Sequence, residues 1–139
     1  MRRAIRLGIC SLALAAGLAA CRERDVDPGP LGDAAQRAWD AYNSAPGADT
    51  YQTFLKSNRA AADRHGRPED RIGVEYQIRA LEAMADHAVR EHDVSAADDV
   101  IERAREIESH DLVGVYDEVR PGFAARLAAS KARAAPLVR

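Results

Sequence analysis

The sequence predicts an all-α fold class, a small bundle of five or six helices over residues 34–135. Apolar residues recur at spacings of three and four, which places them on one face of a helix. Runs that alternate apolar and polar residues are missing from the sequence, and β-branched and aromatic residues are sparse. Proline and glycine fall between the periodic segments, so we expect short loops between the helices.

Two helices are expected before residue 66. Asp33 caps the first, with Gln36 three residues later in a capping-box pattern, and the sequence APG ends it. Asp49 with Gln52 caps the second, which ends at Gly66, a residue type that commonly follows a helix. The large side chains expected to face inward from this pair are Trp39, Tyr42, Tyr51, Phe54 and Leu55.

The third expected helix is the longest. Pro68 takes its first position, and the acidic residues Glu69 and Asp70 fall in its first turn, where they favour a helix N-terminus. Asp93 and Val94 end it. Its buried face is predicted to consist of Val74, Ile78, Leu81, Ala85, Ala88 and His92.

Three further segments complete the bundle. Ser95 with Asp98 caps the fourth helix, the fifth begins near His110, and Pro121 separates the fifth from the last helix. Residues 136–139 are expected to form a frayed C-terminal tail. The predicted inward-facing residues of these segments are Ala97, Val100, Ile101, Ala104, Ile107, Leu112, Val115, Tyr116, Val119, Phe123 and Leu127.

The third and fourth helices also match, loosely, the apolar and small positions of a tetratricopeptide (TPR) unit. Ser109 stands where that repeat usually has proline, and no second copy occurs 34 residues away on either side. Because a solenoid needs at least about three repeats, a generic antiparallel helix pair is favoured, and a single TPR-like hairpin within the bundle stays open. The matching positions are Leu81, Met84, Ala85, Ala88, Ala97, Ile101 and Ala104.

The first 33 residues differ in composition from the rest of the chain. Arg2, Arg3 and Arg6 precede 14 uncharged residues, LGICSLALAAGLAA, a length that suits a signal peptide at 1–20 and falls short of the roughly 20 residues of a membrane span. An uncleaved anchor helix is the alternative, which the abundance of alanine and glycine disfavours. The segment that follows is charged and then rich in proline and glycine, and it predicts a flexible tether over 21–33.

The stretch Leu18-Ala19-Ala20-Cys21 resembles the lipobox of bacterial lipoproteins, in which an aliphatic residue and two small residues precede a cysteine. The resemblance covers the first 21 residues. It implies cleavage between Ala20 and Cys21, a diacylglyceryl thioether on Cys21, and acylation of the new amine, so that several acyl chains would anchor the chain stably in membrane lipid. Cys10 would leave with the signal peptide, so the mature chain would have neither a disulfide nor a free thiol.

Charge limits the classes of partner. Loss of the three leader arginines would change the net charge from −2 to −5, which makes the mature chain a poor candidate for binding nucleic acid or an anionic membrane. Arg22 follows the predicted lipidated cysteine, where lipoproteins retained in the inner membrane usually carry aspartate. In a Gram-negative host, the lipoprotein resemblance therefore implies an outer-membrane protein that faces the periplasm.

The sequence has one candidate metal pair and no catalytic motif. His87 and Glu91 are four residues apart, a spacing that can bind zinc, but a third ligand would have to come from His65 or His110. The pattern is neither HExxH nor HxxEH. No serine lies in a nucleophile motif, and no glycine-rich phosphate loop occurs. We therefore predict no metal, no cofactor and no enzymatic activity.

The remaining class is a binding protein. We expect a lipid-anchored accessory subunit of an envelope complex. The alternative is a small lipoprotein inhibitor or immunity protein against a secreted toxin or cell-wall hydrolase, and a metal-binding or enzymatic periplasmic protein is a more distant third hypothesis. If they are exposed, Trp39, Tyr42 and Tyr51 are the candidate partner-binding residues. The competing interpretation places these aromatic side chains in the core.

Overall fold

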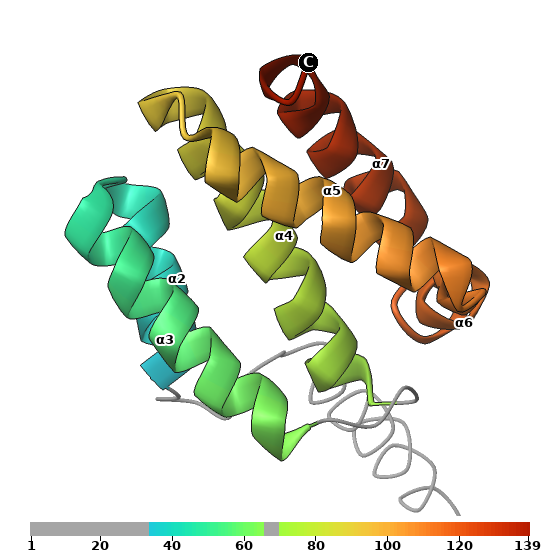
Figure 1. Cartoon of the computed structure of the whole chain (residues 1–139). Helices are drawn as coiled ribbons and strands as arrows, with labels where there is room; N and C mark the ends of the chain where they lie inside the picture. The colour runs from blue at the N-terminus through green and yellow to red at the C-terminus, as the bar shows by residue number, and fades with distance from the viewer. Residues whose placement is uncertain (1–33, 66–69) are drawn as a thin grey trace, which may run out of the picture.

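A computed structural model describes residues 34–65 and 70–139 and confirms the all-α prediction (Figure 1). These residues form six α-helices and one short 3-10 helix, and they contain no strand. The predicted signal peptide, lipobox and tether lie outside the described residues, as do Asp33, Gly66, Pro68 and Glu69. The elements are α2 (Ala34–Ser44), α3 (Ala48–Arg64), α4 (Arg71–Glu91), α5 (Val94–Ser109), α6 (Leu112–Val119), α7 (Phe123–Ala134) and η1 (Ala135–Leu137).

Helix α4 occupies the centre of the molecule. Figure 1 shows the α2–α3 pair on one side of α4, and α5, α6 and α7 on the other. Helices α4 and α5 form an antiparallel hairpin, as the sequence predicted. Ten of the 21 residues of α4 are buried, so this helix contributes side chains to the cores on both of its sides.

The larger core lies between α4, α5, α6 and α7. The predicted face of α4 is confirmed at Val74, Ile78, Leu81, Ala85 and Ala88, which are all buried in this cluster. Alanines on both α4 and α5 belong to it, and side chains this small allow two helices to approach closely. A second cluster joins α2 and α3 to α4, and it contains Ala38, Tyr42, Tyr51, Phe54 and Ala83.

Two helices begin at other residues than predicted. Asp70 lies outside α4 as its N-cap and accepts hydrogen bonds from the backbone N–H groups of Ile72 and Gly73. Asp93 caps α5 in the same way, through the N–H of Ala96, and Ser95 lies within the helix. Each loop contains several residues that can cap a helix, and an aspartate forms the N-cap in both cases.

Helix α3 also begins earlier than predicted. Its N-cap is Gly47, whose backbone N–H donates to Thr50 Oγ1 at 3.0 Å, and Asp49 falls in the first turn of the helix. The C-terminal end of α4 differs too. His92 is exposed and adopts a left-handed conformation with φ of 52°, so it ends the helix instead of extending its buried face. The short turn to Asp93 requires this reversal of the chain.

The C-terminal segments correct two further predictions. Val115 is exposed, because α6 packs through Leu112, Tyr116 and Val119 and Val115 lies beside that face. The ring of Tyr116 meets Phe123 edge-on, with 5.1 Å between ring centroids. In the predicted tail 136–139, Leu137 packs against the main core through η1, whereas Pro136, Val138 and Arg139 are exposed.

Gly73 marks a close crossing between the end of α3 and the start of α4. A Cβ atom at this position would lie 2.0 Å from the backbone oxygen of His65, whereas a Cβ on Gly114 in α6 would meet nothing within 4 Å. We therefore expect Gly73→Ala to lower the free energy of unfolding by about 1–3 kcal/mol through overpacking. Gly114→Ala should raise the same free energy by about 0.5–1 kcal/mol, since alanine favours helix.

Urea denaturation of both variants measures these changes. If the two substitutions shifted stability in the same direction, the close crossing at Gly73 would be contradicted.

Candidate functional site

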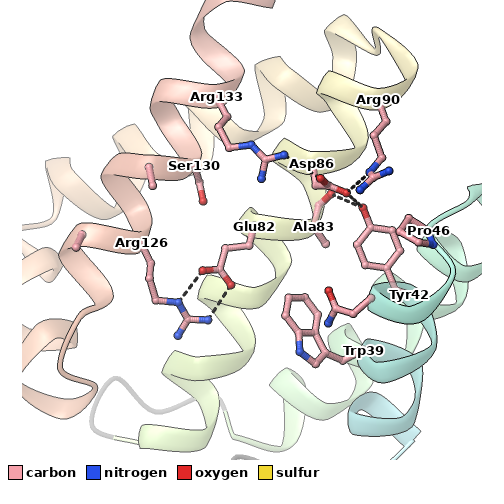
Figure 2. Close-up of a pocket in the computed structure, with 13 residues that line it drawn as sticks. Trp39, Tyr42, Pro46, Glu82, Ala83, Asp86, Arg90, Arg126, Ser130 and Arg133 are labelled. Carbon is pink, nitrogen blue, oxygen red and sulfur yellow. Dashed lines mark hydrogen bonds and ion pairs between the residues drawn. The ribbon is translucent and has the colours of Figure 1, made fainter.

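A groove of about 520 Å³ runs between α2 and α7, and α4 forms its floor (Figure 2). A volume of this size lies in the range of typical ligand-binding clefts. The groove exists because α2 approaches α4 through long polar side chains and not through close backbone packing. Its lining residues are Trp39, Tyr42, Asn43 and Pro46 from α2 and the following loop, Glu82, Ala83, Asp86 and Arg90 from α4, and Ala125, Arg126, Ala129, Ser130 and Arg133 from α7.

A stripe of charged side chains follows the face of α4 between α2 and α7. We call these residues, which recur at spacings of three and four, the polar stripe: Glu75, Arg79, Glu82, Asp86 and Arg90. This spacing places all five on one face of the helix. The polar stripe provides the groups that pair with both neighbouring helices.

The lower end of the polar stripe centres on Glu75, which is buried. Its carboxylate accepts hydrogen bonds from Arg79 Nε at 3.0 Å, Arg120 Nε at 2.7 Å and Arg126 Nη1 at 2.8 Å. Burial alone would raise the pKa of Glu75, but the hydrogen bonds from Arg126 and Arg120 outweigh burial and hold that pKa below its ordinary value. Glu75 is therefore ionised at neutral pH and holds α4, the end of α6 and α7 together.

Arg126 is fixed at the groove floor by two carboxylates. It donates from Nε to Glu82 Oε1 at 2.6 Å and from Nη2 to Glu82 Oε2 at 2.7 Å, in addition to its contact with Glu75. The paired hydrogen bonds with Glu82, supported by those with Glu75, outweigh burial, which acts in the opposite direction, and raise the pKa of Arg126 above its usual value. The positive charge of Arg126 is thus compensated within the protein.

The α2 wall is attached to the polar stripe at two points. Arg79 Nη1 donates to Gln36 Oε1 at 2.8 Å, and its guanidinium lies 5.2 Å from the ring centroid of Trp39. Nearer the other end, Tyr42 donates its hydroxyl proton to Asp86 Oδ2 at 2.6 Å. Burial and the Asp86 carboxylate both raise the pKa of Tyr42, so its hydroxyl remains a donor across the physiological range.

Asp86 joins all three helices at the upper end of the groove. It accepts hydrogen bonds from Tyr42 on α2, from Arg90 Nε at 2.7 Å on α4 and from Arg133 Nη2 at 2.8 Å on α7 (Figure 2). Burial would raise the pKa of Asp86, but the hydrogen bonds from Tyr42, Arg133 and Arg90 outweigh it and lower that pKa. An ionised carboxylate with several donors is suited to holding neighbouring groups in place.

The predicted aromatic patch is wrong for two of its three residues. Tyr42 is 3% exposed and Tyr51 is 5% exposed, so both belong to the core between α2, α3 and α4. Trp39 is half-buried, packs on Phe54 with 5.1 Å between ring centroids, and lines the groove. The α2–α3 pair has few large apolar side chains, and its own core uses most of them.

The candidate metal ligands are not brought together. The His87 ring stacks on Tyr51 with 3.8 Å between ring centroids, and its Nε2 lies 3.5 Å from Asp93 Oδ2. His65 pairs with Asp70 at the start of α4. In residues 34–65 and 70–139, no group of three or more His, Cys, Asp and Glu side chains is placed to hold a metal ion.

A second groove, of about 820 Å³, lies between α3 and α5 on the other side of α4. Its floor includes Leu55, Leu81 and Met84, and its edges carry charges of both signs. Arg103 at this edge pairs with Glu106 at 2.9 Å, and both side chains are more than half exposed. This pair has no neighbour in the polar stripe and provides a matched control for variants in the first groove.

The sequence interpretation missed the polar stripe. A signal was present, because Glu75 and Glu82 are seven residues apart, as are Arg126 and Arg133. Seven residues is close to two helical turns, so both pairs are predicted to align along facing helices.

No protein-family model, curated protein or solved structure matches the chain. Within the part that the structure describes, no helix combines the length and the apolar character needed to cross a bilayer. The functional argument therefore depends on the chemistry and geometry of the groove itself.

Glu75→Gln tests the network below the groove. Removing one charge from a buried ion network leaves arginines uncompensated, so stability at pH 7 should fall by on the order of 3 kcal/mol. Because the pKa of Glu75 is lowered by folding, its contribution is present above the ordinary value of 4.5 and is lost as pH falls through the lowered pKa. The stability difference between the wild type and Glu75→Gln should therefore shrink from pH 7 towards pH 3.

Thermal and urea unfolding across this pH range provide the measurement. Glu106→Gln is the matched control. Its ion pair with Arg103 is exposed and should contribute only about 0–1 kcal/mol to the free energy of unfolding. A difference for Glu75→Gln that stays constant down to pH 3 would contradict the assignment.

Proposed function

We propose that the chain is a lipid-anchored bacterial lipoprotein whose helical domain binds a protein partner in the α2–α4–α7 groove, as a non-catalytic accessory subunit of an envelope complex. The observation that carries the binding function is the groove itself. It is open to solvent, it has a half-buried tryptophan on one wall, and two half-exposed arginines lie at its upper end.

The chemistry of the groove favours recognition over catalysis. Tryptophan and arginine are among the residues that contribute most to protein interfaces, and the groove contains Trp39, Arg90 and Arg133. Folding lowers the pKa of Asp86, whereas a carboxyl group that transfers protons near neutral pH needs a raised pKa. The groove therefore offers fixed charges and an aromatic surface.

The anchor in this proposal comes from the lipobox resemblance at Cys21. A lipidated cysteine followed by a tether over 21–33 would hold the domain within roughly 40–45 Å of the membrane, the reach of thirteen extended residues. Arg22 after the cysteine favours the periplasmic face of the outer membrane. A groove held this close to the membrane would meet partners of the cell envelope.

The anchor predicts selective labelling at one of two cysteines. In bacteria fed an alkyne fatty acid, the wild-type chain should be labelled and Cys21→Ser should lose the label. Cys10→Ser, the matched control, should keep it, since Cys10 lies within the predicted signal peptide. Labelling that persists in Cys21→Ser, measured by in-gel fluorescence, would refute the lipoprotein assignment.

The binding function predicts position-dependent crosslinking. A photo-crosslinking amino acid at Asn43, an exposed groove residue, should capture a discrete envelope protein when the full-length chain is expressed in cells. The same amino acid at Asp98, exposed on α5 and outside both grooves, should not. Mass-shifted bands on immunoblots give the measurement, and equal products from both positions would contradict a partner in the groove.

A further inference from the structure

The hydrogen-bonded groups at the upper end of the groove carry a net charge of +1, and the exposed Glu91 carboxylate acts on Arg90 from outside this set. Arg90 and Arg133 share a single carboxylate, that of Asp86, and each uses one nitrogen to reach it. Their side chains are 52% and 47% exposed, so several N–H donors of each guanidinium face solvent. Arg126, in contrast, donates to two carboxylates, those of Glu82 and Glu75, and its side chain is only 29% exposed.

Ser130, a buried residue, adds a hydroxyl that lines the groove at the same end. The residue is 3% exposed and lies on α7 one turn before Arg133, and Figure 2 shows its side chain on the groove side of the helix. Its hydroxyl has no hydrogen-bond partner among residues 34–65 and 70–139. The hydroxyl faces the groove, so its O–H can donate to a ligand that lies there.

We propose that this end of the groove binds the carboxylate of an aspartate or glutamate in an acidic segment of the partner protein. Arg90 and Arg133 donate to the carboxylate from the two sides, and Ser130 donates from the α7 wall. An apolar residue beside the acidic one packs on Trp39. The inference rests on the proposed function, because it names the chemistry of the partner that the groove would take.

Charge and shape favour a carboxylate over a phosphate. The local charge of two guanidinium groups and one carboxylate is +1, which matches a single negative charge and leaves a doubly charged phosphate uncompensated. The lining also includes Trp39, Pro46 and three alanines, an apolar surface that a peptide side chain can cover. The net charge of −2 for the chain opposes attraction to an anionic lipid surface.

Selection from a random peptide library provides the test. The full lipidated chain, purified in detergent, is used to select ten-residue peptides, and their binding is measured by fluorescence of Trp39, the single tryptophan of the sequence. The selected peptides should share an aspartate or glutamate beside an apolar residue. Replacing that acid by its amide should weaken binding at least about tenfold, because a charge-assisted hydrogen bond is lost.

Variants of the chain locate the contact. Arg90→Gln and Arg133→Gln should each weaken the binding of the acidic peptides about tenfold. The affinity for the amide peptides should stay the same. Arg103→Gln removes the same charge from a half-exposed pair in the other groove and should have no effect. Circular dichroism melting checks that each variant folds, as expected for ion pairs that are half exposed.

Several outcomes would overturn the inference. The library could yield no binding peptides, or binding peptides that do not share an aspartate or glutamate. The affinities could also be the same in both arginine variants as in the wild type. Inorganic phosphate that displaces peptides better than acetate would assign the groove to phosphate groups. A change of Trp39 fluorescence on phosphatidylglycerol vesicles would assign it to lipid.

Crosslinking from Asn43 separates this inference from the proposed function. If the captured partner is retained in the Arg90→Gln/Arg133→Gln double variant, protein binding stands and the carboxylate contact is wrong. If the wild-type chain captures no partner, the proposed function itself fails.

Discussion

Helix α4 packs against α3 on one side and against α5 and α7 on the other, and the arrangement of the other helices depends on this double contact. A helix buried on two faces has little surface left for polar residues, and α4 places five of its seven charged residues in the polar stripe. The part of the stripe from Glu82 to Arg90 lies where α2 and α7 flank α4 without closing over it, whereas Glu75 and Arg79 are buried. The groove therefore forms because two faces of α4 pack in the two cores and the charged face between α2 and α7 is left partly open.

Charge pairing along this stripe also fixes the register between α4 and α7. Much of the apolar contact in the main core is made by alanines and other small side chains, which discriminate weakly between neighbouring registers. Arg126 reaches Glu75 and Glu82 at once, and Arg133 reaches Asp86. A shift of α7 by one turn would take Arg126 away from Glu82, which has no hydrogen bond to another arginine in the described part of the chain, and would remove one of the three arginines from Glu75. The network thus specifies a single alignment of the two parallel helices.

The sequence was sufficient to predict the features that depend on residues close together along the chain. Apolar spacing located all six helices and the buried face of α4 up to Ala88, because a helix repeats over short distances. Helix starts were missed by one to three residues where two cap-forming residues compete, as at Asp93 and Ser95. The groove could not be predicted, since Tyr42, Asp86 and Arg133 are 44 and 47 residues apart and meet only after the whole bundle has folded.

The groove is positive although the chain is net negative. At physiological ionic strength charges separated by more than about 8 Å are largely screened, so Arg90 and Arg133 dominate for a group already inside the groove. The net charge gives an acidic partner no attraction at long range, and affinity would have to arise after contact, from hydrogen bonds to arginine and packing on Trp39. Under the proposed lipid anchor, such a site would gain from confinement, because a tethered domain and a membrane-bound partner would meet at high effective concentration. The proposed anchor and a groove of this charge would therefore complement each other.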